Sequence, residues 1–289
     1  MANEVTPSIA SAVVPEVWGP RLIDALYSKP GVAQRVLNVS ADVKSVGDIA
    51  HISVDNRVTV NDVSSDGTVA PQANTLTDIS LTVNKWKEVT EEWTEITLAQ
   101  AYAIWRDRFP VRAGEGIREK IDNDIMTLVR SDWTSLAAEG DGTGNVGEDE
   151  LIGAIGKLLG NRVPVLAQPD ECTFVFRADD QFKPIKKLGI LDYDRTGVAG
   201  QGGAAMAGIP RIYGIPVIFT QEVESSGSVH YNALFHKSAG AWALQKDVNF
   251  READGLAGRK LTKILNANAL YGFKNTVAAR AVQIKTKDV

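Results

Sequence analysis

Cysteine is almost missing from this chain, which has one, Cys172, in 289 residues. A single thiol excludes an intramolecular disulfide framework and is typical of proteins of a reducing cytoplasm. Cys172 lies in the stretch ECTFVFR, where a buried, inert thiol is expected rather than a nucleophile.

Long apolar runs and an excess of positive charge are missing as well. No stretch approaches the roughly 20 apolar residues of a membrane span, and the mean hydropathy is −0.10. The N-terminal sequence lacks the basic and apolar regions of a signal peptide, so none is expected. The net charge of −5 and the pI of about 5.4 argue against a dedicated nucleic-acid-binding protein. These values favour a soluble protein of one large or two modest domains.

Residues that perform catalysis or bind metals are few. His51 lies on the polar face of a predicted strand, and His230 and His236 lie roughly 20 Å apart along another, too far apart for one metal ion. The glycine-rich stretch 197–208 lacks the lysine and hydroxyl residue of a phosphate-binding loop. The stretch from Asp141 lacks the glycine and final glutamate of a calcium loop. The sequence therefore predicts no catalytic residue, no metal site and no cofactor, and the protein is not expected to be an enzyme.

The first part of the chain reads as an N-terminal segment followed by a β-rich arm. Residues 1–40 contain several prolines and one short amphipathic segment around Trp18. Residues 41–90 show apolar–polar alternation on both sides of the turn-rich stretch SSDGTVAPQANT, which predicts a long two-stranded arm. Because an isolated two-stranded hairpin is marginally stable in water, the arm is expected to pack against a neighbour.

A long amphipathic helix is predicted after the arm. Pro110 suits its start and Gly140 suits its C-terminal cap, while a shorter, separate helix is expected at about 95–106. The apolar stripe recurs with the helical period, at Ile117, Ile121, Ile125, Leu128, Val129, Trp133 and Leu136.

The rest of the chain alternates between helix and strand and then turns to β-structure. Helices are predicted at 148–159 and 180–188, and strands in TFVFR, IPVIFT and HYNALF. Residues 246–289 are predicted to be β, with a last short strand at 282–284. One face of an earlier strand there is formed by Leu261, Leu265, Ala267, Ala269 and Tyr271. The fold class is therefore α+β.

Several segments in a fixed order are similar to those of a known family. VPEVWGPRLIDAL is similar to its opening Pro-Glu-x-Trp helix, and VGDIAHISV to the Gly-Asp that leads into its extended-loop strand. LTVNKWKEVTEEWTEI and AGEGIREKIDNDIMTLV are similar to its return strand and spine helix. LLGNRVPV, GIPRIYGIPVIFTQEV and KILNANALYGFKNTVAARAVQIKT are similar to its axial turn, axial strand and closing strands. Over nearly its whole length the chain resembles the major capsid proteins of tailed bacteriophages with the Hong Kong 97-type fold.

This resemblance implies five regions and a structural role. The regions are an N-terminal arm (1–40), an extended loop (41–90), the spine helix of a peripheral domain (91–140), an axial domain (141–245) and closing peripheral strands (246–289). Copies of the chain would form hexamers and pentamers of an icosahedral head around the phage DNA, assembled in the host cytoplasm and found in the virion. The alternative is the shell of a bacterial encapsulated nanocompartment, which holds protein cargo.

The resemblance also implies partners. Residues 1–40 are proline-rich and lack sustained heptads, so a separate scaffolding protein is expected. A portal and a decoration protein are further expected partners, packaged DNA is contacted weakly, and no membrane is involved. The residues expected in the assembly interface are Trp18, Arg57, Asp62, Asp66 and Trp86.

Overall fold

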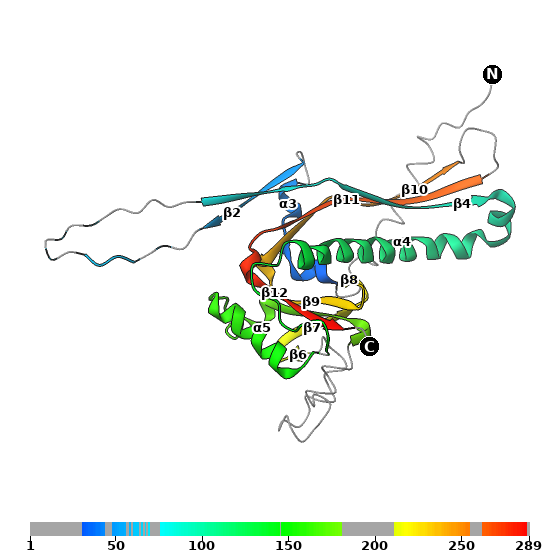
Figure 1. Ribbon diagram of the computed structural model, residues 1–289. Coiled ribbons are helices and arrows are strands. Elements are labelled where there is room, and N and C mark those ends of the chain that lie inside the picture. The colour runs from blue at the N-terminus through cyan, green and yellow to red at the C-terminus, as the bar shows by residue number, and fades with distance from the viewer. Residues whose placement is uncertain are drawn as a thin grey trace.

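A computed structural model describes residues 31–43, 48–55, 58, 60–63, 65, 67, 69, 76–144, 146–180, 211–254 and 262–287. The segment around Trp18, residues 181–188 of an expected helix and the glycine-rich stretch 197–208 lie outside them. The described residues form two larger β-sheets, a long helix shared by both, and a two-stranded arm that projects from the body (Figure 1). None of the described helices is both long and apolar enough to cross a membrane.

The first sheet has four strands and supports the long helix α4 (Glu95–Ser131) on one face (Figure 1). Its three long strands are antiparallel and β1 is parallel to β10. Along β4, half-buried and exposed residues alternate, and Val89 and Trp93 pack against the core beneath α4. The strand order is β1 (Leu37–Asn38), β10 (Gly240–Asp254), β11 (Thr262–Asn275) and β4 (Lys85–Thr94).

The second sheet lies between α4 and α5 (Glu148–Gly160). Strands β5 and β7 are parallel and nearly all buried, as continuous apolar runs such as CTFVFR and IPVIFT predict. The predicted strands TFVFR, IPVIFT and HYNALF and the helix at 148–159 are confirmed. The order is β12 (Ala281–Lys287), β9 (Val229–His236), β5 (Cys172–Arg177), β7 (Ile215–Thr220) and β6 (Arg211–Ile212), with β8 (Ser225–Ser226) beside β9.

The arm is an antiparallel pair of strands, β2 (Ile49–Asp55) and β3 (Leu76–Thr82). At its base, Ala50 and Leu81 are buried with Ala241 and Ala243 of β10 in a small core that also includes Val43 of the short helix α3 (Ser40–Val43). The arm is thus attached to the face of the four-stranded sheet opposite α4, and the rest of it extends away from the body (Figure 1).

Helix α4 is longer at its start and shorter at its end than predicted. One helix runs from Glu95 through Pro110 to Ser131, so Pro110 does not begin it and the separate first helix is wrong. Proline in a helix interior loses a backbone hydrogen bond, yet Phe109 beside it is buried 5.6 Å from the Phe250 ring, and this packing holds the helix to the sheet. Gly140 does have a positive φ of 74°, but in the loop that follows the helix rather than at its cap.

The apolar stripe of α4 is confirmed as its buried face. Ile117, Ile121, Ile125 and Val129 belong to one core cluster, which includes residues of both sheets. Trp133 belongs to the same cluster although it lies just after the helix, and its ring is 4.9 Å from Phe235 of β9. One core therefore joins α4 to both sheets.

Two strand assignments differ from the sequence prediction. Residues 85–94 form one strand of the four-stranded sheet, whereas the predicted extended loop ran to residue 90. The last strand, β12, pairs with β9 of the second sheet instead of closing the peripheral set with the rest of 246–289. Alternation along a strand shows which residues share a face but not which strand is its neighbour, and β-pairing over long sequence separations is decided by packing.

Candidate assembly surface

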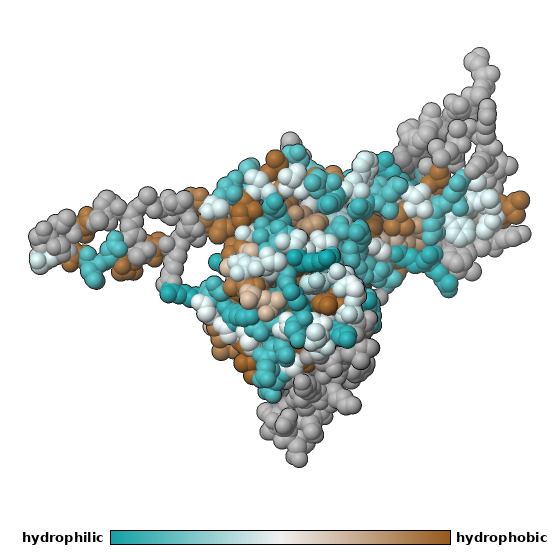
Figure 2. Space-filling model, in the orientation of Figure 1, coloured by the Kyte–Doolittle hydropathy of each residue, from teal (hydrophilic) through white to brown (hydrophobic). Residues whose placement is uncertain are grey.

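The arm has one apolar face whose burial falls with distance from the body. Ala50 pairs with Leu81 at the base, where both are almost completely buried, and Ile52 pairs with Ile79, where both are half-buried. Farther out, Val58 is 70% and Val60 92% exposed. Figure 2 shows hydrophobic residues along this projecting arm. An extended arm that holds several valines exposed to solvent presents an apolar surface that a partner can cover.

The arm is also acidic. Residues 48–82 contain five aspartates against one arginine and no lysine. On the polar face His51 is exposed, as predicted, and its Nδ1 lies 2.7 Å from Asp78 Oδ2. Of the residues expected in the interface, Asp62 is exposed near the tip, while Arg57 and Asp66, like Trp18, lie outside the described residues.

Trp86 is 71% exposed on β4 and lies on the sheet face opposite α4. Its partner across the strand pair is Leu270, which is half-buried against the small core at the base of the arm. Trp86 and the arm thus share one side of the sheet, so the structure brings Trp86 close to the base of the arm but not to Asp62 at its far part.

A second exposed apolar surface lies on α5. Its inner residues, Leu151, Ala154 and Leu158, are buried against the second sheet. On the outer side Ile152 and Leu159 are exposed about two helical turns apart, and Leu166 in the following turn is 64% exposed. Figure 2 shows hydrophobic residues along the lower left edge of the body, where Figure 1 places α5.

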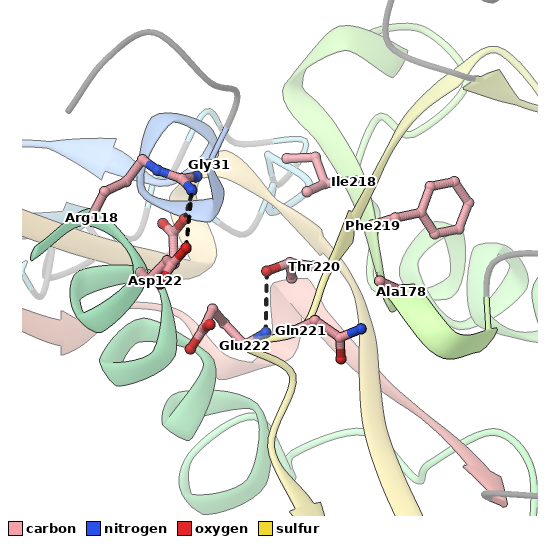
Figure 3. A pocket seen from close by; sticks show the side chains of 10 residues that line it. Gly31, Arg118, Asp122, Ala178, Ile218, Phe219, Thr220, Gln221 and Glu222 are labelled. Atoms are coloured by element: carbon pink, nitrogen blue, oxygen red, sulfur yellow. Dashed lines mark hydrogen bonds and ion pairs between the residues drawn. The ribbon is translucent and has the colours of Figure 1, made fainter. Parts of the chain in front are cut away.

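A cavity of about 410 Å³ lies between α4, the end of β7 and Gly31 (Figure 3). Asp122 of α4 is 2% exposed in its wall, and the Ala33 N–H donates to its Oδ1 at 2.9 Å. Arg118 Nη1 is 3.7 Å from Asp122 Oδ2. Burial raises the pKa of Asp122 to about 6, against the lowering effect of these contacts. Burial and the nearby Glu119 also raise the pKa of Glu222 across the cavity.

The buried Asp122 predicts a pH dependence of stability. A carboxyl whose pKa is raised in the folded state favours folding below its unfolded pKa, and this contribution is lost as pH rises through about 6. We expect Asp122→Asn to gain about 2 kcal/mol of unfolding free energy relative to the parent chain between about pH 4 and pH 8. Urea unfolding at each pH measures this, with Asp149→Asn, an exposed position on α5 away from the cavity, as the control. A constant difference between variant and parent would contradict the assignment.

The cysteine and two of the three histidines are buried. Cys172 is fully buried, as expected, and burial raises the pKa of its thiol to about 11, which disfavours the nucleophilic thiolate. His230 and His236 lie on β9 and are both buried. No group of three or more His, Cys, Asp or Glu side chains suited to a metal ion is found in the described part of the chain.

Sequence reasoning missed the Asp122 cavity and the outer face of α5. Asp122 and Glu222 are far apart in the sequence, and neither stands in a recognisable motif, so only the folded chain brings them together. The α5 surface had a signal: apolar residues lie on more than one side of GAIGKLLG, which is more than one buried face requires.

No protein-family model and no curated protein matches the chain, but several solved structures have a similar fold. A chain from Mycobacterium phage Che8 superposes with a TM-score of 0.67 at 18% identity, covering 89% of this chain and 91% of that one. The capsid of cyanophage P-SCSP1u superposes with a TM-score of 0.66 at 10% identity, and the match covers 90% of this chain and 89% of that one. The virus-like particle from Pyrococcus furiosus superposes with a TM-score of 0.55 at 9% identity, and the match covers 95% of this chain and 100% of that one.

Likeness at these identities shows a shared fold. It extends over about nine-tenths of the chain and includes several phage capsids. The chain therefore has the fold of tailed-phage capsid proteins, which confirms the Hong Kong 97-type fold that its sequence resemblance predicts.

Proposed function

We propose that the protein is a major capsid protein, whose copies assemble into the icosahedral head of a tailed phage around its DNA. The single observation that supports this best is the arm, which holds apolar residues such as Val58 and Val60 in solvent, far from the core of its own chain. Burial of such residues against another copy removes them from water at about 25 cal/mol per Å². The capsid fold supplies the kind of assembly.

The domain arrangement of the proposal follows the family. The arm is the extended loop, α4 is the spine, the second sheet with α5 forms the axial domain, and the four-stranded sheet belongs to the peripheral domain. Hexamers and pentamers would form through the axial domains, where the exposed stripe of Ile152, Leu159 and Leu166 provides an apolar contact surface. Obligate interfaces of this kind bury roughly 2,000–5,000 Å².

The proposal also covers where the particle assembles and with which partners. Shells would assemble in the host cytoplasm with a scaffolding protein and a portal, and would remain as the virion head, with a decoration protein as a further partner. Packaged DNA would be contacted weakly, because the net charge of the chain is −5. The role is structural and requires no catalytic residue or cofactor.

A second candidate function is the shell of a nanocompartment with protein cargo. The observation that favours it is the likeness to the Pyrococcus furiosus virus-like particle, which covers 95% of this chain. The phage structures superpose better, with TM-scores of 0.62–0.67 for the first three against 0.55, so we place the phage head first.

Electron microscopy of the purified protein, expressed with and without its neighbouring genes, tests both candidates. Closed shells that contain DNA support the phage head, and closed shells that contain a defined protein support the nanocompartment. A chain that remains monomeric at high concentration with all neighbouring gene products present would contradict both. The nucleic-acid content is read from the ratio of absorbance at 260 and 280 nm, and any protein cargo from mass spectrometry.

The shell is expected to be held without covalent bonds between subunits. In the family's namesake a lysine of the extended loop joins an asparagine of a neighbour, but here no lysine lies between Lys44 and Lys85. Arg57 is the cation of that stretch, and its guanidinium stays protonated and is a poor nucleophile. Mature particles boiled in detergent should give one band near 31.2 kDa. A ladder of heavier species that resists reducing agent would contradict this prediction.

A further inference from the structure

Helix α5 has one solvent-exposed face that runs along its whole length. The exposed residues recur at intervals of three and four positions, so they lie on the same side of the helix. They are Glu148, Asp149, Ile152, Gly156, Leu159 and Gly160. The opposite side of α5 is buried against the second sheet. The exposed face therefore belongs to the surface of the single chain, and Ile152 and Leu159 are its large apolar residues.

Gly156 lies near the centre of this face. A Cβ added there would meet nothing within 4 Å, so packing within the chain does not require a glycine. An exposed glycine inside a helix lowers stability relative to alanine, but it lets another backbone come close to the helix. Gly116 of α4 is equally open, and its helical neighbour Arg112 is charged. Gly156 differs because it lies between Ile152 and Leu159, which are both apolar and exposed.

Opposite charges lie at the two ends of the exposed face. Asp149 is in the first turn of α5, and Arg162 follows the C-cap residue Asn161. Both are exposed, and within the described part of the chain neither has an ion-pair partner. Arg162 has a φ of 61°, at a position where glycine is usual because a side chain there is strained. The face is thus acidic at one end, apolar in the middle and basic at the other end.

This order makes the face complementary to itself. Asp149 precedes Ile152 by three residues, and Arg162 follows Leu159 by three residues. In an antiparallel pair of α5 helices that cross at Gly156, Ile152 meets the partner's Leu159. Asp149 then meets the partner's Arg162, and symmetry repeats both contacts. A parallel pair would instead bring like charges together at each end.

We propose that two copies of the free chain pair through this face of α5, antiparallel and about a two-fold axis near Gly156. Two-fold pairs of this kind are the commonest soluble oligomers. One face of one helix buries less than the roughly 1,000 Å² of a stable interface, so the dimer is transient. The inference needs two copies only and does not rest on the proposed function. Because hexamers and pentamers would use the same apolar stripe, the dimer would have to separate before they form.

Sedimentation velocity of the full chain, over a wide range of concentrations below those that give shells, tests the pairing. The parent chain should form a dimer whose fraction rises with concentration. Arg162→Glu replaces two attractions by two repulsions and should raise the dissociation constant about tenfold. Asp149→Arg should have the same effect.

The double variant Asp149→Arg/Arg162→Glu is the decisive one. It exchanges the two charges, so it should restore the dissociation constant of the parent chain. The two positions lie roughly 20 Å apart along one chain, so this rescue arises between copies and requires an antiparallel pair. A double variant that dimerises no better than the single variants would overturn the proposal.

Gly156→Leu provides a second, independent readout. Leucine favours a helix more than glycine does, so the single chain should not lose resistance to urea. The dimer should nevertheless be lost, because the new side chain stands where the two helices are closest. Gly116→Leu, the matched control on α4, should dimerise like the parent chain. Unchanged dimerisation of Gly156→Leu, or a parent chain that never populates a dimer, would also overturn the proposal, and neither result depends on whether shells form.

Discussion

A chain without the outer arm should fold normally and fail to form closed shells. We expect this of a deletion of Arg57–Asn74 combined with Thr75→Gly, which leaves Asn56-Gly between Asp55 and Leu76. These last two residues are the outermost pair of β2 and β3, and Asn-Gly is a favoured two-residue hairpin turn. The base of the arm, with Ala50 and Leu81 in their small core, is untouched.

The unfolding free energy of this deletion variant should not fall, because the exposed valines make no contribution to the core of their own chain and a shorter loop costs less closure entropy. Urea unfolding and electron microscopy of the same preparation measure both properties. Normal heads from the deletion variant would show that the arm is not the assembly surface.

Two point substitutions sharpen this experiment. Val60→Asp and Asn61→Asp each add one carboxylate at neighbouring exposed positions of the arm, but the first also removes an apolar side chain that is 92% exposed. Burial of an unpaired charge in an interface is costly, so Val60→Asp should reduce the yield of shells by far more than Asn61→Asp. Equal yields would mean that the apolar face of the arm is not covered on assembly.

Replacement of Trp133 by alanine should cost about 3–5 kcal/mol of unfolding free energy. Trp133 is completely buried where the end of α4 meets β9, and its ring is packed 4.9 Å from Phe235. Its removal leaves a cavity in the core that joins α4 to both sheets. Urea unfolding of the unassembled chain measures the loss, which would be the largest of the substitutions considered.

Two further variants test whether the loss of stability comes from the buried position of Trp133. Trp133→Phe keeps an aromatic ring and removes an indole N–H that is buried without a hydrogen-bond partner, so it should cost much less than alanine. Trp86→Ala, at a position 71% exposed, should change the stability of the single chain by less than about 0.5 kcal/mol. If Trp86→Ala lowered the unfolding free energy as much as Trp133→Ala, burial would not explain the effect of Trp133.

The sequence by itself determined the elements whose signal is local and repeated. The apolar stripe from Ile117 to Val129 required a helix with one buried face, and runs such as CTFVFR required buried strands. The arm was predictable because alternation on both sides of a turn-rich stretch leaves a hairpin with too little apolar surface for a core. The order of the segments that resemble the capsid family also predicted the fold. Each segment alone is a weak signal, but their order along the chain is specific.

The tertiary structure decided what depends on contacts between distant parts of the chain. Pro110 continues a helix because Phe109 packs on Phe250, a residue far along the sequence. Strand β12 joins β9 because the second sheet offers it a partner and a shared core, which no alternation pattern can specify. The environments of Asp122 and Glu222 arise in the same way. Their burial and partners come from other elements, and a pKa is set by the surroundings that folding creates around a group rather than by its neighbours in sequence.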